Sequence, residues 1–316
     1  MGRLLSYSGI STKIRAMQSK LISESEIQEM LQFTSVSHAA AWLKRTPEYA
    51  KAWADLDENS LHRGQIEKLL KASIFKDFSK IYQFANPEQR KFLDLYSRRY
   101  EIRVLKEIMT NLFDHKSTDA VDVSPYCDFF RRHSKLDLDR LTACTTMDEF
   151  INTLKGNEFY VPLSRIQNHD TALLFDYGMA LDLYYFSMIW NVRKKLFSGK
   201  DLEQITTAYG EKFDMLNLQF ISRSKRYFSM APADIYALLI PMNYKLKKEE
   251  ITALVEASTR EEAQQIFRKT YYGKKYDHLS AHNLEEFYNY MLRTTPARIP
   301  IPWQCFIPTC TTRSTK

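Results

Sequence analysis

The sequence predicts an all-α protein, and three observations support this fold class. Apolar residues recur at helical spacing, as in Ile66, Leu69, Leu70 and Ile74. Only eight glycines occur in 316 residues, which argues against Gly-rich phosphate loops and turn-dense β-sandwiches. No Asn-Gly or Asp-Gly pair, the strongest short signal for a hairpin, is present. We therefore expect amphipathic helices joined by short connections.

Three segments match one another: "SVSHAAAWLKRTPEY" from Ser35, "TMDEFINTLKGNEFY" from Thr146 and "TREEAQQIFRKTYYG" from Thr259. Each begins with a hydroxyl residue, which is a favoured helix N-cap. In the second and third segments a glutamate follows three positions later (Glu149 and Glu262), and this spacing predicts a capping box. The starting positions are 111 and 113 residues apart.

A second pair of segments repeats at the same interval. "YSRRYEIRVLKEI" from Tyr96 and "YGEKFDMLNLQFI" from Tyr209 are 113 residues apart, and their apolar positions match: Ile102 with Met215, Leu105 with Leu218, Ile108 with Ile221. We therefore predict three helical units of about 112 residues. They cover residues 1–95, 96–208 and 209–297, the third unit is incomplete, and residues 298–316 form an aberrant tail.

The most apolar stretch, residues 172–190, contains Asp176 and Asp182. We interpret it as a buried or partner-facing helix and not as a membrane span, so that any membrane association is peripheral. The start "MGRLLSYSGI" is too polar for a secretory signal. Cys127 and Cys144 are the only cysteines before the tail, which fits a reducing cytoplasm.

The charge balance favours an ordinary solvated surface. Lys and Arg number 45 against 38 acids, giving +7 and a pI near 9.0, but the two signs are interleaved along the chain. Paired acids such as Asp137 with Asp139 and Glu249 with Glu250 are typical of helix N-termini. The basic cluster 222–226 is consistent with a solvated or partner-facing helix.

None of the strong catalytic, nucleotide or metal signatures occurs in the sequence. We predict no catalytic, cofactor-binding or metal-ligating residue. The weak alternative is a zinc site made of His278, His282, Cys305 and Cys310, but their spacing matches no familiar zinc motif.

The stretches "SGISTKIRAMQSKLISESEIQEML" and "FDMLNLQFISRSKRYFSMAPADIYALLIPMNYKLKKEEITALVEA", together with the triplicated capped helix, resemble one family. It is the central-stalk subunit of V-type and archaeal A-type rotary ATPases, called C in prokaryotes and d in eukaryotes. The similarity runs from about Tyr7 to about Thr295, and its most specific part is residues 213–257.

The resemblance implies three similar helical units arranged as a funnel-like helical array. It implies a non-catalytic subunit without cofactor, small-molecule substrate or nucleic acid. Such a subunit links the membrane proteolipid c-ring to the central shaft subunits, on the cytoplasmic face of the cell membrane, for ATP-coupled proton or sodium transport. Arg15, Arg103 and Arg223, which lie on basic helices, are predicted polar contacts with these partners.

Two other functions stay open from the sequence alone. One is a helical scaffold or adaptor unrelated to ATPases, to which a helical repeat would equally belong. The other is a nucleic-acid-binding helical repeat, which the positive net charge suggests.

The tail 298–316 contains three prolines and two cysteines, whereas the family continues here into another apolar helix. We predict a reading-frame shift. With one choice of synonymous codons, reading from the third base of the Arg298 codon gives "NPHSMAMFYTYLHDKE", which is amphipathic and similar to the family. The alternative is a genuine irregular tail. If the frame is shifted, we expect the helix around Phe287, Tyr290 and Met291 to expose apolar surface.

Overall fold

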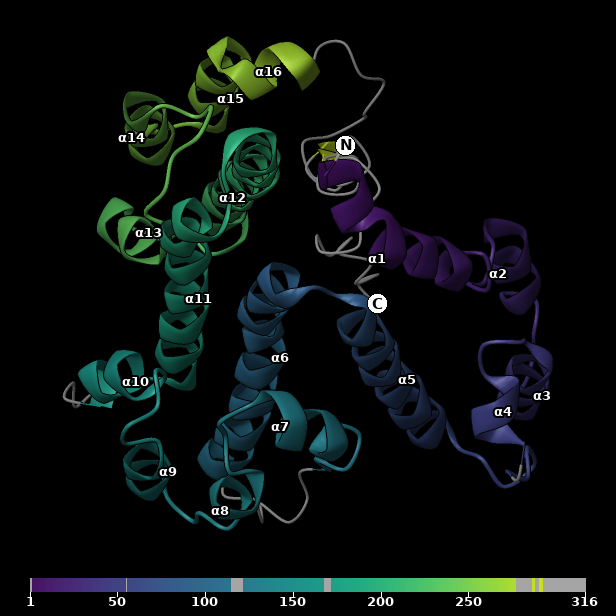
Figure 1. Cartoon of the computed structure of the whole chain (residues 1–316). Coiled ribbons are helices and arrows are strands. Elements are labelled where there is room, and N and C mark those ends of the chain that lie inside the picture. The colour runs from purple at the N-terminus through teal and green to yellow at the C-terminus, as the bar shows by residue number, and fades with distance from the viewer. Residues whose placement is uncertain are drawn as a thin grey trace. The chain divides into compact units, whose positions relative to one another are not determined.

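The computed structural model describes residues 2–54, 56–114, 122–167 and 172–276 and the pairs 286–287 and 290–291. All regular structure in these ranges is helical, which confirms the all-α prediction (Figure 1). The chain divides into two compact units, residues 1–160 and 161–316. The division into three repeated units stays a prediction. The tail 298–316, with Cys305 and Cys310, lies outside the described residues, and so do His278 and His282.

The first unit holds the helices up to α9. Within it α1 packs on α5, α3 on α4, α5 on α7, and α9 on both α6 and α8. The helices are α1 (Gly2–Gln18), α2 (Glu24–Met30), α3 (Val36–Arg45), α4 (Ala50–Trp53), α5 (Arg63–Phe84), α6 (Pro87–Phe113), α7 (Cys127–His133), α8 (Leu138–Thr142) and α9 (Met147–Thr153).

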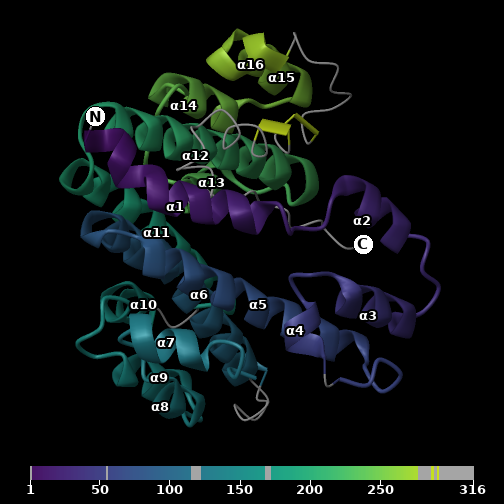
Figure 2. The ribbon, with the colours of Figure 1, turned by 45° about the vertical axis from the view of Figure 1, so that its right-hand side comes forward.

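The second unit begins inside α10, after its first residue. Two long helices, α11 and α12, pack on each other, and α13 to α16 pack in chain order, as can be followed in Figure 2. The helices are α10 (Tyr160–Gln167), α11 (Leu174–Leu196), α12 (Gly199–Tyr227), α13 (Pro232–Leu238), α14 (Lys248–Glu256), α15 (Arg260–Lys269) and α16 (Tyr271–Tyr276).

The predicted hydroxyl N-caps are confirmed at α3, α9 and α15. The side chains of Ser35, Thr146 and Thr259 each accept a hydrogen bond from the backbone N–H three residues later. The predicted capping boxes are wrong in one detail. Glu149 and Glu262 accept from the N–H one residue before the cap, at 2.9 and 2.8 Å, because a glutamate side chain is long enough to reach past the cap residue.

The three matching segments also end alike. Just beyond the helical residues, a backbone N–H donates to the carbonyl three positions earlier, and the acceptor residue is 2% exposed in each case. The pairs are Thr46 to Leu43 at 3.0 Å, Asn157 to Leu154 at 2.9 Å and Thr270 to Phe267 at 3.0 Å. The local structure therefore agrees in all three segments.

The apolar register shared by α6 and α12 is buried on both helices, as the match predicts. Every matched position is at most 6% exposed: Tyr96, Ile102, Leu105 and Ile108 on α6, and Tyr209, Met215, Leu218 and Ile221 on α12. The paired acids also lie where predicted. Asp137 caps α8 and accepts from the Arg140 N–H, whereas Glu249 and Glu250 lie in the first turn of α14.

The core of the second unit surrounds the inner face of α12 and includes Ile251, Leu254, Phe267 and Tyr272. Phe287 and Met291 belong to this core and are fully buried, so the expectation that they expose apolar surface is wrong for these two residues. Phe287 packs edge-on against Phe267 with 6.0 Å between ring centroids. Tyr290 is 41% exposed, as expected.

A single threonine joins α15 to α16. Thr270 is fully buried, and its hydroxyl donates to the Phe267 carbonyl at 2.7 Å while accepting from the Gly273 N–H at 3.0 Å. Gly273 lies directly on the backbone of the last turn of α15. The glycine is required there, since a Cβ atom would lie 2.5 Å from the Arg268 Cα.

The apolar stretch 172–190 forms most of α11. Its buried residues follow one another at intervals of four: Tyr177, Leu181, Tyr185, Ile189 and Arg193. In the described part of the chain, no helix combines the length and the apolar composition that a membrane crossing needs.

Candidate functional site

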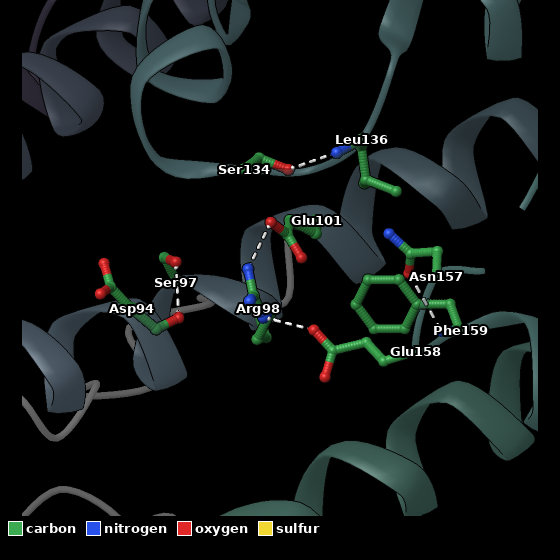
Figure 3. Close-up of polar contacts among 9 residues, drawn as sticks. All are labelled: Asp94, Ser97, Arg98, Glu101, Ser134, Leu136, Asn157, Glu158 and Phe159. Atoms are coloured by element: carbon green, nitrogen blue, oxygen red, sulfur yellow. Dashed lines mark hydrogen bonds and ion pairs between the residues drawn. The ribbon is translucent and has the colours of Figure 1, made fainter.

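Helix α6 carries a carboxylate inside the first unit (Figure 3). Glu101 lies on the same face of the helix as Leu105 and Ile108 and is 2% exposed. Arg98, one turn earlier, donates from Nη1 to Glu101 Oε1 at 2.8 Å. The Arg98 Nε also pairs with Glu158 Oε1 at 2.6 Å. One guanidinium therefore joins α6 to the segment that follows α9.

Two loops meet this charged group. In the loop before α8, Ser134 interacts with the Glu101 carboxylate and accepts a hydrogen bond from the Leu136 N–H at 3.0 Å. In the segment after α9, Asn157 Oδ1 accepts from the Phe159 N–H at 3.0 Å, and the Phe159 side chain is fully buried. Both turns are visible in Figure 3, on either side of the Arg98–Glu101 pair.

Burial raises the pKa of Glu101 above its ordinary value of 4.5, and the nearby Glu158 charge acts in the same direction. The Arg98 charge and the hydrogen bond from Ser134 oppose this rise. The net direction is upward because burial penalises the ionised form most strongly.

We expect the stability difference between the wild type and Glu101→Gln to depend on pH. Below pH 4.5 Glu101 is protonated in both the folded and unfolded states. At higher pH the unfolded state ionises first, so the wild type loses stability relative to the glutamine variant. Urea unfolding of both proteins over a pH series measures this. Glu88→Gln, an exposed glutamate on the same helix, is the matched control. A wild-type advantage that grows with pH would contradict the expectation.

Helix α12 carries the corresponding carboxylate in the second unit. Asp214 is fully buried and accepts four hydrogen bonds. The N–H of Tyr244 donates to Oδ1 at 3.1 Å, and the N–H groups of Lys245 and Leu246 donate to Oδ2 at 2.6 and 3.0 Å. The Tyr272 hydroxyl also donates to Oδ2, at 2.8 Å. The carboxylate thus fixes the loop before α14 and the start of α16.

Burial raises the pKa of Asp214, and the four hydrogen bonds oppose that rise. Burial and the Asp214 charge both raise the pKa of Tyr272. The tyrosine therefore stays protonated at physiological pH and keeps donating to the carboxylate.

Further contacts hold the segment 240–246 along α12. Gly210 allows the Tyr244 ring to lie on the helix backbone, since a Cβ there would be 2.8 Å from the Tyr244 Cβ. The Tyr244 hydroxyl lies 3.0 Å from the Thr207 hydroxyl. Asn217 both donates to the Ile240 carbonyl at 3.0 Å and accepts from the Ile240 N–H at 2.9 Å. This segment is therefore anchored at several points.

The two carboxylates are 113 residues apart, the same interval that relates Tyr96 to Tyr209. Each lies on the buried face of a long helix and fixes the loop that leads to the next short helix. The sequence analysis missed both Glu101 and Asp214. The available signal was an acid that falls within the matched apolar register of both segments.

The chemistry of this arrangement is structural. The oxygens of Asp214 are occupied by four donors, so this carboxylate is not placed to accept a proton from a substrate. In the ranges that the structure describes, no group of three or more His, Cys, Asp or Glu residues is arranged to bind a metal ion. We interpret the two buried carboxylates as braces between helices.

The three predicted contact residues lie on the surface of separate helices. Arg15 is on α1 and Arg103 on α6, both in the first unit, whereas Arg223 is on α12 in the second unit. All three are exposed. The neighbouring Lys225 serves the fold, because its Nζ donates to the Ala257 carbonyl at 2.6 Å. The role of the three arginines as partner contacts stays a prediction.

Comparison with known proteins identifies relatives. The family model described as ATP synthase (C/AC39) subunit matches residues 10–298, so the match ends where the predicted aberrant tail begins. The A-type ATP synthase subunits C of Methanocaldococcus jannaschii and Methanobrevibacter smithii are each 22% identical, over 70% and 78% of this chain. That of Methanosphaera stadtmanae is 20% identical over 88%.

The first two alignments cover 55% and 62% of those relatives' own length, so the chain matches less than two thirds of each. For the Methanosphaera stadtmanae protein the share is 69%. The family model extends over nearly the whole chain and includes both braced helices, α6 and α12. The chain therefore belongs to the ATP synthase C/AC39 subunit family of A/V-type ATPases.

Proposed function

We propose that this chain is a non-catalytic central-stalk subunit of a rotary ATPase. It links the rotating shaft subunits to the proteolipid ring, peripherally on the cytoplasmic face of the membrane, and so couples ATP turnover to proton or sodium transport. The observation that supports this most strongly is the match to the C/AC39 family over residues 10–298. The match also favours this role over an unrelated scaffold or a nucleic-acid-binding repeat.

The packing is suited to a part that transmits torque. Such a part must resist deformation, and densely packed interiors have low compressibility. In each unit a buried carboxylate joins a long helix to loops distant in sequence. These contacts restrict sliding of the short helices along α6 and α12. We propose that this stiffness, and not a reactive group, is what the chain contributes to the complex.

We further propose that Arg15, Arg103 and Arg223 make polar contacts with the ring or the shaft. Each is exposed on a helix, where a long cationic side chain reaches acidic groups of another subunit. Charge reversal at these positions should weaken assembly more than Arg140→Glu, which changes an exposed arginine on α8. Equal retention of all four variants would remove the three arginines from the proposed interface.

We expect membrane vesicles that lack this chain to hydrolyse ATP without pumping ions, because the shaft is no longer joined to the ring. Adding the purified chain should restore pumping, and the chain should sediment with the membranes. The measurement is ATP-driven ion uptake alongside ATP hydrolysis in the same inverted vesicles. Full pumping without the chain would refute the proposal. Recovery of the chain with RNA in a salt-sensitive manner would instead favour nucleic-acid binding.

A further inference from the structure

Arg193 is a buried cation in the last turn of α11. It occupies the final position of the buried stripe on this helix and is 7% exposed. Its Nε donates to the Thr206 hydroxyl of α12 at 3.1 Å, and Nη1 donates to the Trp190 carbonyl. The guanidinium also lies over the Trp190 ring, with the central carbon 3.4 Å from the ring centroid.

These contacts leave most of the guanidinium's hydrogen-bonding capacity unused. A guanidinium has five N–H donors, and the Thr206 and Trp190 bonds engage two of them. Within the described residues no carboxylate forms an ion pair with Arg193. The contrast with Arg98 is direct, since that arginine, in the other unit, holds two carboxylates, Glu101 and Glu158.

A buried charge without a counter-ion is costly to fold. The negative end of α11 and the face of the indole offset part of this cost. Burial lowers the pKa of Arg193, but an arginine keeps its charge at physiological pH. A chain that keeps such a cation in place carries an unmet requirement for an anion.

The geometry points to the shape of that anion. The Trp190 ring covers one face of the guanidinium, so hydrogen bonds are available in its plane. Two parallel N–H groups in one plane fit the two oxygens of a carboxylate. The exposed Lys194 and Lys195 lie next in the chain, and Lys200 follows at the start of α12. These lysines provide a positive field that attracts an acidic partner.

We propose that Arg193 receives the carboxylate of an Asp or Glu side chain from another subunit of the ATPase complex. This inference rests on the proposed function, because it needs a partner subunit. Arg193 then serves as an anchor whose cost is met only on assembly, and the lysines on either side of the α11–α12 connection guide the acid to it.

The variant Arg193→Met tests the proposal, because methionine keeps much of the unbranched apolar stem and removes the charge. In the isolated chain we expect the urea midpoint to stay unchanged or to rise, since an unpaired buried cation is removed. On membranes stripped of the wild-type chain, we expect the affinity to fall by at least about thirtyfold, as for other buried interfacial charges. Binding of the purified chain to these membranes is measured by sedimentation.

Lys194→Met is the matched control, since it removes one exposed positive charge from the next position. We expect a smaller loss of affinity for this variant, which disappears at high salt. Arg193→Lys should recover the charge but not the planar pair of donors, and its affinity should lie between those of the wild type and Arg193→Met.

Three outcomes would overturn the proposal. A lower urea midpoint of isolated Arg193→Met would assign the counter-ion to this chain itself. A rise of the wild-type midpoint with inorganic phosphate at constant ionic strength, absent in Arg193→Met, would make the occupant a small anion. Unchanged membrane binding of Arg193→Met would overturn this inference alone. If the wild type itself does not bind, the proposed function fails, and this inference fails with it.

Discussion

Replacing Asp214 by alanine is expected to lower the free energy of unfolding by about 3 kcal/mol or more. The substitution removes the acceptor of four hydrogen bonds and leaves their donors behind. The Leu246 N–H and the Tyr272 hydroxyl are buried, so water cannot readily replace the carboxylate there. Asp214→Asn should also destabilise the fold, because the amide group turns its own N–H donors toward these donors.

Urea unfolding measures the loss of stability, and hydrogen exchange locates it. We expect the amides of Tyr244, Lys245 and Leu246 to exchange faster in Asp214→Ala, because each donates to this carboxylate in the wild type. Glu203→Ala, which changes an exposed acid on the same helix, should leave both readouts nearly unchanged. Unaltered exchange of the three amides would show that the carboxylate does not hold this loop.

Gly273→Ala is expected to destabilise the second unit by about 3 kcal/mol, although alanine is the better helix former. The new methyl group would collide with the Phe267 carbonyl oxygen and would lie 2.5 Å from the Arg268 Cα. Both are backbone atoms, so no side-chain rotation relieves the clash. Helix α16 must shift, which disturbs the hydrogen bond from the Gly273 N–H to Thr270 and the adjacent one from Tyr272 to Asp214.

Gly9→Ala is the control with the same chemical change. Gly9 lies within α1, and nothing lies within 4 Å of an added Cβ. There the helix propensity acts alone and should stabilise the chain by about 0.5 to 1 kcal/mol. Thermal unfolding of the two variants beside the wild type measures both effects. A melting temperature for Gly273→Ala at or above the wild-type value would refute the close approach of α16 to α15.

The sequence was sufficient for features that depend on local periodicity. The hydroxyl caps at Ser35, Thr146 and Thr259 are predictable, because capping requires only a short polar side chain before an apolar run. The capping boxes that form at Ser23 and Asn86 contain the same type of signal, and the analysis overlooked them. The reach of Glu149 was not predictable, since it depends on the path of the chain before the cap.

The buried charges depend on long-range contacts and are therefore harder to predict. An acid among apolar residues of a helix is usually read as facing solvent, and Glu101 and Asp214 look ordinary on their own. Their partners lie 57 and 30 to 58 residues further along the chain. Arg193 closes an apolar stripe at intervals of four, but only the packing of α12 against α11 shows that it is covered.

The distance in sequence between Asp214 and its donors has a consequence for synthesis on the ribosome. Helix α12 is made first, and the last donor, Tyr272, follows 58 residues later. At roughly 5 to 20 residues per second, roughly 3 to 12 seconds pass between the two. During this interval the carboxylate is hydrated, and the apolar face of α12 lacks its cover. The nascent chain therefore reaches its native topology in a late step, and this interval is when a chaperone has most to protect.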